Sequence, residues 1–260
     1  EPVIVTTTPS SGFKMSAAQL RAAITPRTRL FILNSPCNPT GAVYTRADWL
    51  ALGAVLREHP QVTILTDDIY EHILWADEPF VSFAAACPDL FGRTITVNGV
   101  SKAYAMTGWR LGYAAGPAAV IKAMTTVQSQ STTSACTISQ AAAVAALNGD
   151  QSGVRERSEI FRQRHALVIE RMNRIPGFEC VPAHGAFYVF PRVVEAMRLH
   201  GTSGDAEFCE QILEATDVAL VPGSAFGAPG YLRMSFAASV ETFEDALSRI
   251  ERFMSAARHS

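Results

Sequence analysis

The sequence predicts an α/β fold, in which a mostly parallel sheet carries helices on both faces and a smaller α+β domain follows at the C-terminal end. Short apolar runs alternate with stretches of helical periodicity, which is typical of a parallel, helix-covered sheet. Near Asn148-Gly149-Asp150 the chain changes to a long, highly charged helical pattern. We therefore expect residues 1–150 to form part of a large domain and residues 151–260 to form the small one.

The elements expected in the first part follow from local signals. Ser16 is a helix cap, and Thr25-Pro26 stops that helix at about Ile24. The run Leu30-Phe31-Ile32-Leu33 is apolar throughout, which predicts a buried strand. Further strands are expected over 3–7, 62–66, 94–97 and 111–115, and helices over 46–58, from Pro117 to a polar stretch at 128–137, and over 138–147.

The second part is predicted to mix strands and helices. A charged helix over about 154–174 ends at Pro176-Gly177 and bridges the two domains. After it we expect strands over 178–181, 186–190, 218–221 and 231–236, and helices over 205–216 and 240–254.

Composition excludes several classes of protein. The chain has 48% hydrophobic and 18% charged residues and a net charge of −2, so we expect neither nucleic-acid nor membrane binding. No apolar run reaches the roughly 18 residues of a membrane span. The five cysteines are widely spaced, which predicts free thiols and a cytoplasmic protein. The six histidines show no ligand spacing, so no metal site is expected.

The stretch Gly99 to Tyr113 carries the first candidate chemistry. Lys102 lies just after a predicted strand, among small residues, and Arg110 follows the lysine eight positions later. A desolvated lysine is a nucleophile toward aldehydes, and an arginine can clamp a phosphate with two hydrogen bonds. The pair suggests an aldehyde cofactor that carries a phosphate, of which pyridoxal 5'-phosphate is the common one. Taken alone, the two residues also fit a solvated surface pair.

Two more segments supply complementary groups at predicted strand ends, where open α/β sheets bind ligands. In Asn34 to Gly41, two X–Pro bonds predict a rigid turn in which the Asn38 amide can donate to a phenolate-like oxygen. In Thr66 to Glu71, Asp67 can pair with a protonated ring nitrogen, and Tyr70 can reach the same ring. The alternatives are an ordinary Asn-Pro turn and a helix N-terminus that Asp67 or Asp68 merely caps.

Arg233 is the last candidate. It lies within Tyr231 to Phe236, whose alternation predicts a half-buried strand. A buried arginine needs an anionic partner, whereas an edge-strand arginine can point to solvent.

With these motifs in chain order, the sequence resembles the class I/II pyridoxal-phosphate-dependent aminotransferases of fold type I, the family of aspartate aminotransferase. The resemblance implies that Lys102 forms the Schiff base with the cofactor and then moves the proton. It also implies that Asp67 pairs with the ring nitrogen and that Asn38 and Tyr70 hold the ring oxygen. Phosphate binding falls to Arg110 and Ser101, and Arg233 binds the substrate carboxylate. Gly99 stands where many relatives have a serine, and Gly185 before Phe187-Tyr188 matches a turn that faces the substrate.

The family reading implies transfer of an amino group between an L-amino acid and a 2-oxo acid, with aspartate and 2-oxoglutarate as the default pair. Two alternatives stay open: a carbon–sulfur β-lyase of the same fold, and an aminotransferase-like sensing domain of a transcription regulator. Family members are usually homodimers, which we expect of the full-length protein. No segment matches the family's N-terminal portion, so we expect the chain to be N-terminally truncated. A chain without that portion can be inactive alone.

Overall fold

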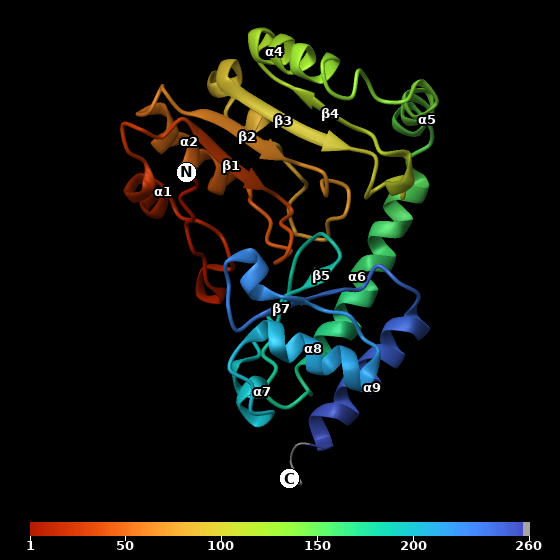
Figure 1. The fold of residues 1–260 in the computed structure, drawn as a ribbon. Helices are drawn as coiled ribbons and strands as arrows, with labels where there is room; N and C mark the ends of the chain where they lie inside the picture. Colours follow the sequence, from red (N-terminus) through yellow and green to blue (C-terminus); the bar gives the residue numbers. More distant parts are fainter. Residues whose placement is uncertain (257–260) are drawn as a thin grey trace.

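The computed structural model describes residues 1–256, and its larger sheet lies in the N-terminal half (Figure 1). Its strands follow the spatial order β1 (Leu30–Asn34), β2 (Thr63–Asp67), β3 (Thr94–Gly99) and β4 (Gly112–Ala115). The first three run parallel, and β4 is antiparallel to β3. The expected mostly parallel α/β sheet is confirmed.

The helices of this half begin where local capping predicts. Ser16 and Thr45 each form a capping box, which satisfies backbone N–H groups at the start of the helix. Trp49 and Leu52 of the second helix pack against Phe31 and Ile64 of the sheet. The helices are α1 (Ala17–Ala23), α2 (Arg46–Arg57), α3 (Phe83–Ala86), α4 (Ala118–Ser129) and α5 (Thr137–Asn148). Short 3-10 turns cover Pro9–Ser11, Pro88–Arg93 and Thr107–Trp109.

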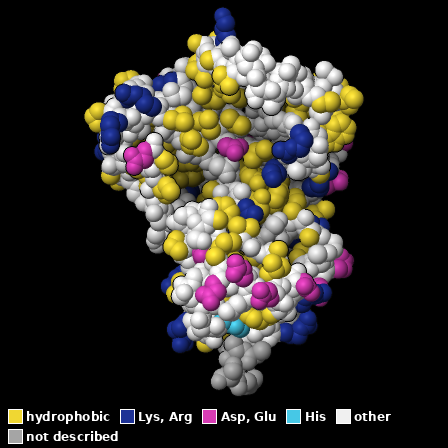
Figure 2. Space-filling model, in the orientation of Figure 1, with side chains coloured by type: hydrophobic (Ala, Val, Ile, Leu, Met, Phe, Trp, Pro, Cys, Tyr) yellow, Lys and Arg dark blue, Asp and Glu magenta, His cyan; other side chains and the backbone are white. Residues whose placement is uncertain are grey.

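The prediction of a fully buried first strand is wrong for one face. Phe31 and Leu33 are buried, but Leu30 is 47% and Ile32 63% exposed. β1 is an edge strand, and alternate side chains of a strand point to opposite faces. Figure 2 shows hydrophobic side chains gathered over the larger sheet. The described residues thus leave part of one sheet face uncovered.

The C-terminal half has its own sheet and core. Its three antiparallel strands follow the order β5 (Tyr188–Val189), β7 (Leu232–Ser235) and β6 (Val221–Pro222). The surrounding helices are α7 (Val194–Leu199), α8 (Asp205–Thr216) and α9 (Val240–Ala256), with a 3-10 turn at Gly223–Phe226. Phe208, Phe236 and Phe243 are buried at the centre of this core.

The long helix α6 (Ser152–Met172) connects the two halves. Val154 near its start belongs to a small cluster with Tyr70, Ala103 and Tyr188, whereas Met172 at its end belongs to the C-terminal core. Since the halves have separate cores, we propose the domain division at residues 150 and 151.

Three strand predictions are wrong, and each failure has a physical reason. Residues 3–7 form no strand, because no neighbouring strand pairs with them and Val3 is 74% exposed. Residues 178–181 form a single bridge, Glu179 with Arg192, since the side-chain amide of Asn173 bonds both the N–H and the C=O of Cys180. The strand expected at 218–221 is displaced to β6, and α7 was not predicted.

Among residues 1–256, no helix is both long and apolar enough to cross a membrane.

Candidate active site

The predicted site residues emerge from one edge of the larger sheet. Asn34 at the end of β1 is in register with Asp67 at the end of β2, which in turn is in register with Val97 of β3. The turn after β1, the Asp67–Tyr70 segment and the Lys102 loop therefore start side by side at the carboxyl ends of three parallel strands.

The turn after β1 is held by Asn34. Its side chain donates to the Asp67 carbonyl at 2.8 Å and accepts from the Asn38 N–H at 2.8 Å. Both X–Pro bonds, Ser35–Pro36 and Asn38–Pro39, are cis. Gly41 closes the turn with a φ of 66°, and a Cβ there would lie 2.7 Å from the Gly185 carbonyl oxygen. Only glycine fits this close approach of the two halves of the chain.

Asn38 and Arg233 are in direct contact. Nη1 of Arg233 donates to Oδ1 of Asn38 at 2.9 Å. Because a guanidinium can only donate, this contact fixes the amide orientation, with Oδ1 toward the arginine and Nδ2 away from it. Among the described residues, Nδ2 makes no hydrogen bond, so Asn38 keeps both N–H groups of its amide for a ligand.

The Arg233 guanidinium is half-buried between aromatic rings. Its Cζ lies 4.6 Å from the Tyr188 ring centroid and 5.1 Å from that of Phe226. No carboxylate of residues 1–256 pairs with it, and its buried Nε has no hydrogen-bond partner there. A buried cation without an anion is costly, so this geometry favours an anionic ligand over the solvent-facing alternative.

Lys102 points into an aromatic corner. Its Nζ lies 5.9 Å from the ring centroid of Tyr70 and 5.8 Å from that of Phe187. Arg157 of helix α6 holds the lysine loop, since it donates to the Ala103 carbonyl at 3.0 Å. The Tyr104 hydroxyl donates to Gln151, just before that helix, at 2.9 Å. The described residues offer Lys102 no carboxylate within ion-pair distance, so its amine is available for chemistry.

The two adjacent aspartates have different surroundings. Asp67 is half-buried, and burial raises the pKa of its carboxyl, while the Ile69 N–H, at 3.1 Å from Oδ1, and the Lys102 ammonium lower it. Asp68 is fully buried, and burial together with the Glu71 carboxylate raises its pKa to about 7. Of the two, only Asp67 has its pKa lowered by the Lys102 ammonium, and it is less buried, so it is the better partner for a cationic ring nitrogen.

Tyr70 faces Lys102 with its ring and Tyr188 with its hydroxyl. The two phenolic oxygens are 2.9 Å apart, and both residues are buried. Burial raises the pKa of Tyr70, so its phenol stays protonated and able to donate.

Arg110 and Ser101 leave the same end of the sheet, because Gly99 of β3 is in register with Gly112 of β4. The exposed Arg110 donates to the Thr107 carbonyl at 3.1 Å, and Thr107 in turn donates to the Ser101 carbonyl at 2.9 Å. Within residues 1–256, no hydrogen bond or ion pair joins either side chain to the other predicted site residues. The structure thus places both at this edge, and among residues 1–256 neither side chain is hydrogen-bonded to Lys102.

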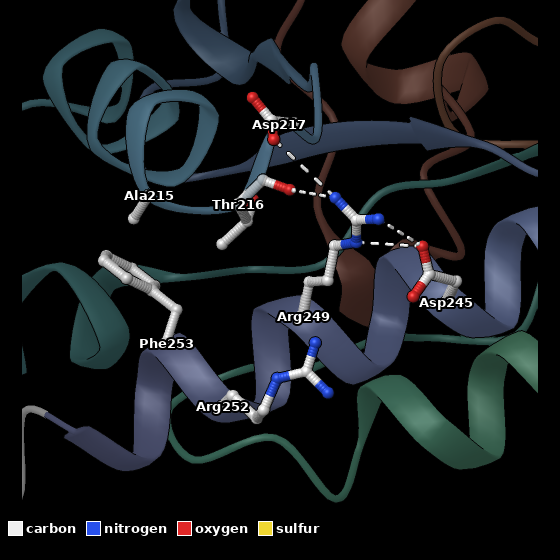
Figure 3. Close-up of a pocket in the computed structure, with 7 residues that line it drawn as sticks. All are labelled: Ala215, Thr216, Asp217, Asp245, Arg249, Arg252 and Phe253. Carbon is white, nitrogen blue, oxygen red and sulfur yellow. Dashed lines mark hydrogen bonds and ion pairs between the residues drawn. The ribbon is translucent and has the colours of Figure 1, made fainter.

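A cavity of about 430 Å³ lies elsewhere, between the end of α8 and α9 (Figure 3). Arg249 within it pairs with Asp245 at 2.8 Å and Asp217 at 3.7 Å, so its charge is already balanced. None of the predicted site residues lines it. Its lining is Ala215, Thr216, Asp217, Asp245, Arg249, Arg252 and Phe253.

Sequence reasoning missed two side chains at the site. Phe226, whose ring lies beside Arg233, is not part of any motif recognised in the sequence. The hydroxyl contact of Tyr188 depends on how β5 approaches the Asp67–Tyr70 segment. The turn Gly185–Tyr188 was the only available signal, and it did not identify which side chain faces Tyr70.

Known proteins resemble this chain in sequence and in fold. Residues 1–250 match the family model described as aminotransferase class I and II, and the chain belongs to that family. It is 50% identical over 98% of its length to an aspartate/prephenate aminotransferase of Nitrosomonas europaea, and 51% identical over 96% to an aspartate aminotransferase of Rhizobium meliloti. The chain spans 66% and 62% of the lengths of these two relatives.

Solved structures agree. The crystal structure of the aspartate aminotransferase from Rhizobium meliloti matches 98% of this chain with a TM-score of 0.91 and 47% identity, and the chain covers 65% of it. The aspartate aminotransferase from Thermus thermophilus with maleate matches 96% with a TM-score of 0.85 and 42% identity, and the chain covers 63% of it.

Proposed function

We propose that this chain binds pyridoxal 5'-phosphate and that the protein transfers an amino group between an L-amino acid and a 2-oxo acid. One observation carries the proposal. The Lys102 amine lies against the rings of Tyr70 and Phe187, at the sheet edge that also holds Asp67. A nucleophilic amine beside aromatic surface and a carboxylate suits a flat, cationic ring that bears an aldehyde.

The groups left without partners fit such a cofactor and an amino-acid substrate. Asn38 Nδ2 makes no hydrogen bond, and Arg233 Nε is a buried donor without an acceptor among the described residues. Burial disfavours the charged form of the Asp67 carboxyl, and a nearby cation favours it. The cofactor needs a donor for its ring oxygen and an acceptor for its ring nitrogen, and the amino-acid substrate needs donors for its carboxylate. These residues supply such groups.

Each residue then has a role. Lys102 would hold the cofactor covalently, Asp67 would pair with its ring nitrogen, and Asn38 and Tyr70 would donate to its ring oxygen. Arg110 and Ser101 would bind its phosphate from the β3–β4 end of the sheet. When bound, pyridoxal phosphate supplies an electron sink for the charge left at the substrate's α-carbon.

The chain's own groups carry the remaining work. Arg233 binds the substrate α-carboxylate, which orients the α-carbon toward Lys102. The Lys102 amine would take the α-proton as a general base and return it as a general acid. Lys102 is half-buried against the rings of Tyr70 and Phe187, which limit the access of water to the amine.

For the substrates we propose aspartate and 2-oxoglutarate, which the printed names of the relatives support. We further propose a homodimeric, cytoplasmic protein. Exposed apolar side chains on α4 and α5, such as Val127 and Ile138, each 71% exposed, support a subunit interface, and five free thiols support a reducing compartment. Sedimentation of the full-length protein tests the dimer.

Borohydride reduction in the presence of pyridoxal phosphate, followed by peptide mass mapping, tests the cofactor site. The chain has three lysines, of which Lys14 is paired with Asp48 and Lys122 is exposed on α4. We expect one adduct, on Lys102, and none in Lys102→Ala. Equal labelling of all three lysines would reject the site. Incubation of the loaded protein with aspartate and 2-oxoglutarate then tests the reaction by the formation of glutamate and oxaloacetate. Incubation with cystathionine tests the lyase alternative, which would cleave its carbon–sulfur bond and release ammonia and pyruvate.

A further inference from the structure

We propose that Tyr188 is a positioning residue that donates its hydroxyl hydrogen bond to Tyr70 and so leaves the Tyr70 proton free for the cofactor. This inference rests on the proposed function, which gives Tyr70 a ring oxygen to bind. The two phenolic oxygens are 2.9 Å apart, and the residues are separated by 118 positions in the chain.

The direction of this hydrogen bond decides its effect. A phenol has one proton, so a Tyr70 that donated to Tyr188 could not donate to a cofactor oxygen at the same time. If Tyr188 is the donor, Tyr70 accepts with a lone pair and keeps its proton. Accepting one hydrogen bond also strengthens the donor power of the same hydroxyl.

The surroundings of the pair favour Tyr188 as the donor. The Arg233 guanidinium lies 4.6 Å from the centroid of the Tyr188 ring. The Tyr70 ring also has a cation near it, the Lys102 ammonium at 5.9 Å from its centroid, so the cations alone do not set the direction of the hydrogen bond. The supply of acceptors does set it: among residues 1–256 the Tyr188 hydroxyl has Tyr70 as its one hydrogen-bond partner, whereas Tyr70 would also have the cofactor oxygen to donate to.

The arrangement connects the two ends of the site. The ring of Tyr188 holds the cation assigned to the substrate carboxylate, and its hydroxyl holds the phenol assigned to the cofactor oxygen. Neighbouring backbone bonds fix this approach, because Ala186 N–H donates to the Ile73 carbonyl at 2.9 Å and Trp75 N–H donates to the His184 carbonyl at 2.9 Å. The segment 73–75 thus binds to 184–186 beside the tyrosine pair.

The test uses Tyr188→Phe, Tyr70→Phe and the double variant, with Tyr104→Phe as a matched control. Tyr104 follows Lys102 closely in the chain. Its phenylalanine variant likewise loses a 2.9 Å hydrogen bond of a tyrosine hydroxyl, but the partner in that bond is Gln151. The readout is the midpoint pH of the absorbance change of the bound cofactor. Losing a donor to the cofactor oxygen disfavours the deprotonated form, so the midpoint rises.

We expect a rise of about half a pH unit in Tyr188→Phe, a larger rise in Tyr70→Phe and none in Tyr104→Phe. The double variant is expected to match Tyr70→Phe, since Tyr188 acts only through Tyr70. A fall of the midpoint in Tyr188→Phe would mean that Tyr70 is the donor, and an unchanged midpoint would mean that the bond is merely structural. Either result overturns the proposal.

A second measurement needs no cofactor. With tyrosine labelled by ¹³C at Cζ, the Tyr70 signal, identified by its loss in Tyr70→Phe, is expected to shift in Tyr188→Phe and to stay in Tyr104→Phe. An unmoved Tyr70 signal would reject the Tyr188 proposal whether or not the protein binds pyridoxal phosphate. Absence of a Lys102 adduct would instead reject the proposed function alone.

Discussion

Arg233 and Asn38, which are 195 positions apart, form a 2.9 Å hydrogen bond between strand β7 of the C-terminal sheet and the turn after β1. The contact uses the amide oxygen of Asn38 and leaves its Nδ2 free, and it holds a cation that no described carboxylate neutralises. One side chain thereby connects the group proposed to bind the substrate with the group proposed to bind the cofactor.

Removing this amide should weaken anion binding at Arg233. A hydrogen bond to a charged group contributes about 1.5–3 kcal/mol, so Asn38→Ala is expected to weaken binding of maleate to the cofactor-loaded protein by about 10-fold to 100-fold. Titration calorimetry measures the effect, with the exposed Gln163→Ala of α6 as control. Unchanged maleate affinity in Asn38→Ala would mean that Arg233 does not need this support or does not bind the anion.

Asp67 is expected to control cofactor retention. Its carboxyl is half-buried with a raised pKa, and Lys102 is the only cation that lowers it in residues 1–256. A cationic ring nitrogen would add a charge-assisted bond, so Asp67→Asn should lower the affinity for pyridoxal phosphate about 10-fold to 100-fold. Equilibrium dialysis measures this, and the exposed Asp77→Asn should retain wild-type affinity. Equal affinities for the two variants would argue against a ring-nitrogen partner.

The sequence predicted correctly those features, such as helix starts and strand ends, that depend on residues close together in the chain. The starts of α1 and α2 follow from Ser16 and Thr45, because a capping box spans only four residues. The strand ends at Asn34 and Asp67 were predicted by the same kind of local change from apolar to polar residues.

Contacts between distant segments were not predictable. An apolar strand looks the same whether one face is covered or both, so the exposure of Ile32 was missed. The strand expected at 178–181 failed because one side chain, Asn173, takes the place of a partner strand. The Tyr70–Tyr188 bond depends on how β5 of the second sheet approaches the first, which no local pattern encodes.

Buried Asp68 should make the protein less stable as the pH rises from about 4 to about 7. Its pKa of about 7 exceeds the usual 3.8, so in this window the native state keeps a proton that the unfolded chain has lost. The loss is on the order of 4 kcal/mol by pH 8. Asp68→Asn does not titrate, so its free energy of unfolding relative to wild type should increase between pH 5 and pH 8. Urea unfolding measures this, with Asp77→Asn as control, and a difference that is constant with pH would contradict it.

Buried His165 should have the opposite effect. Its Nε2 accepts from the Ala183 N–H at 2.9 Å, and burial, followed by the charge of His184, lowers its pKa from 6.5 to about 4. Between these values the unfolded chain binds a proton that the native state does not, so stability is lost as the pH falls from 6.5 to 4, by on the order of 3 kcal/mol.

In His165→Gln an amide oxygen can still accept the Ala183 hydrogen bond but does not titrate. This variant should lose packing against Trp75 at every pH, so its free energy of unfolding should be lower than that of wild type. This deficit in unfolding free energy should shrink toward pH 4. Urea unfolding between pH 4 and pH 7 measures this deficit, and the control His59→Gln lies outside the aromatic cluster. A deficit that grows as the pH falls would show that His165 is protonated in the native state.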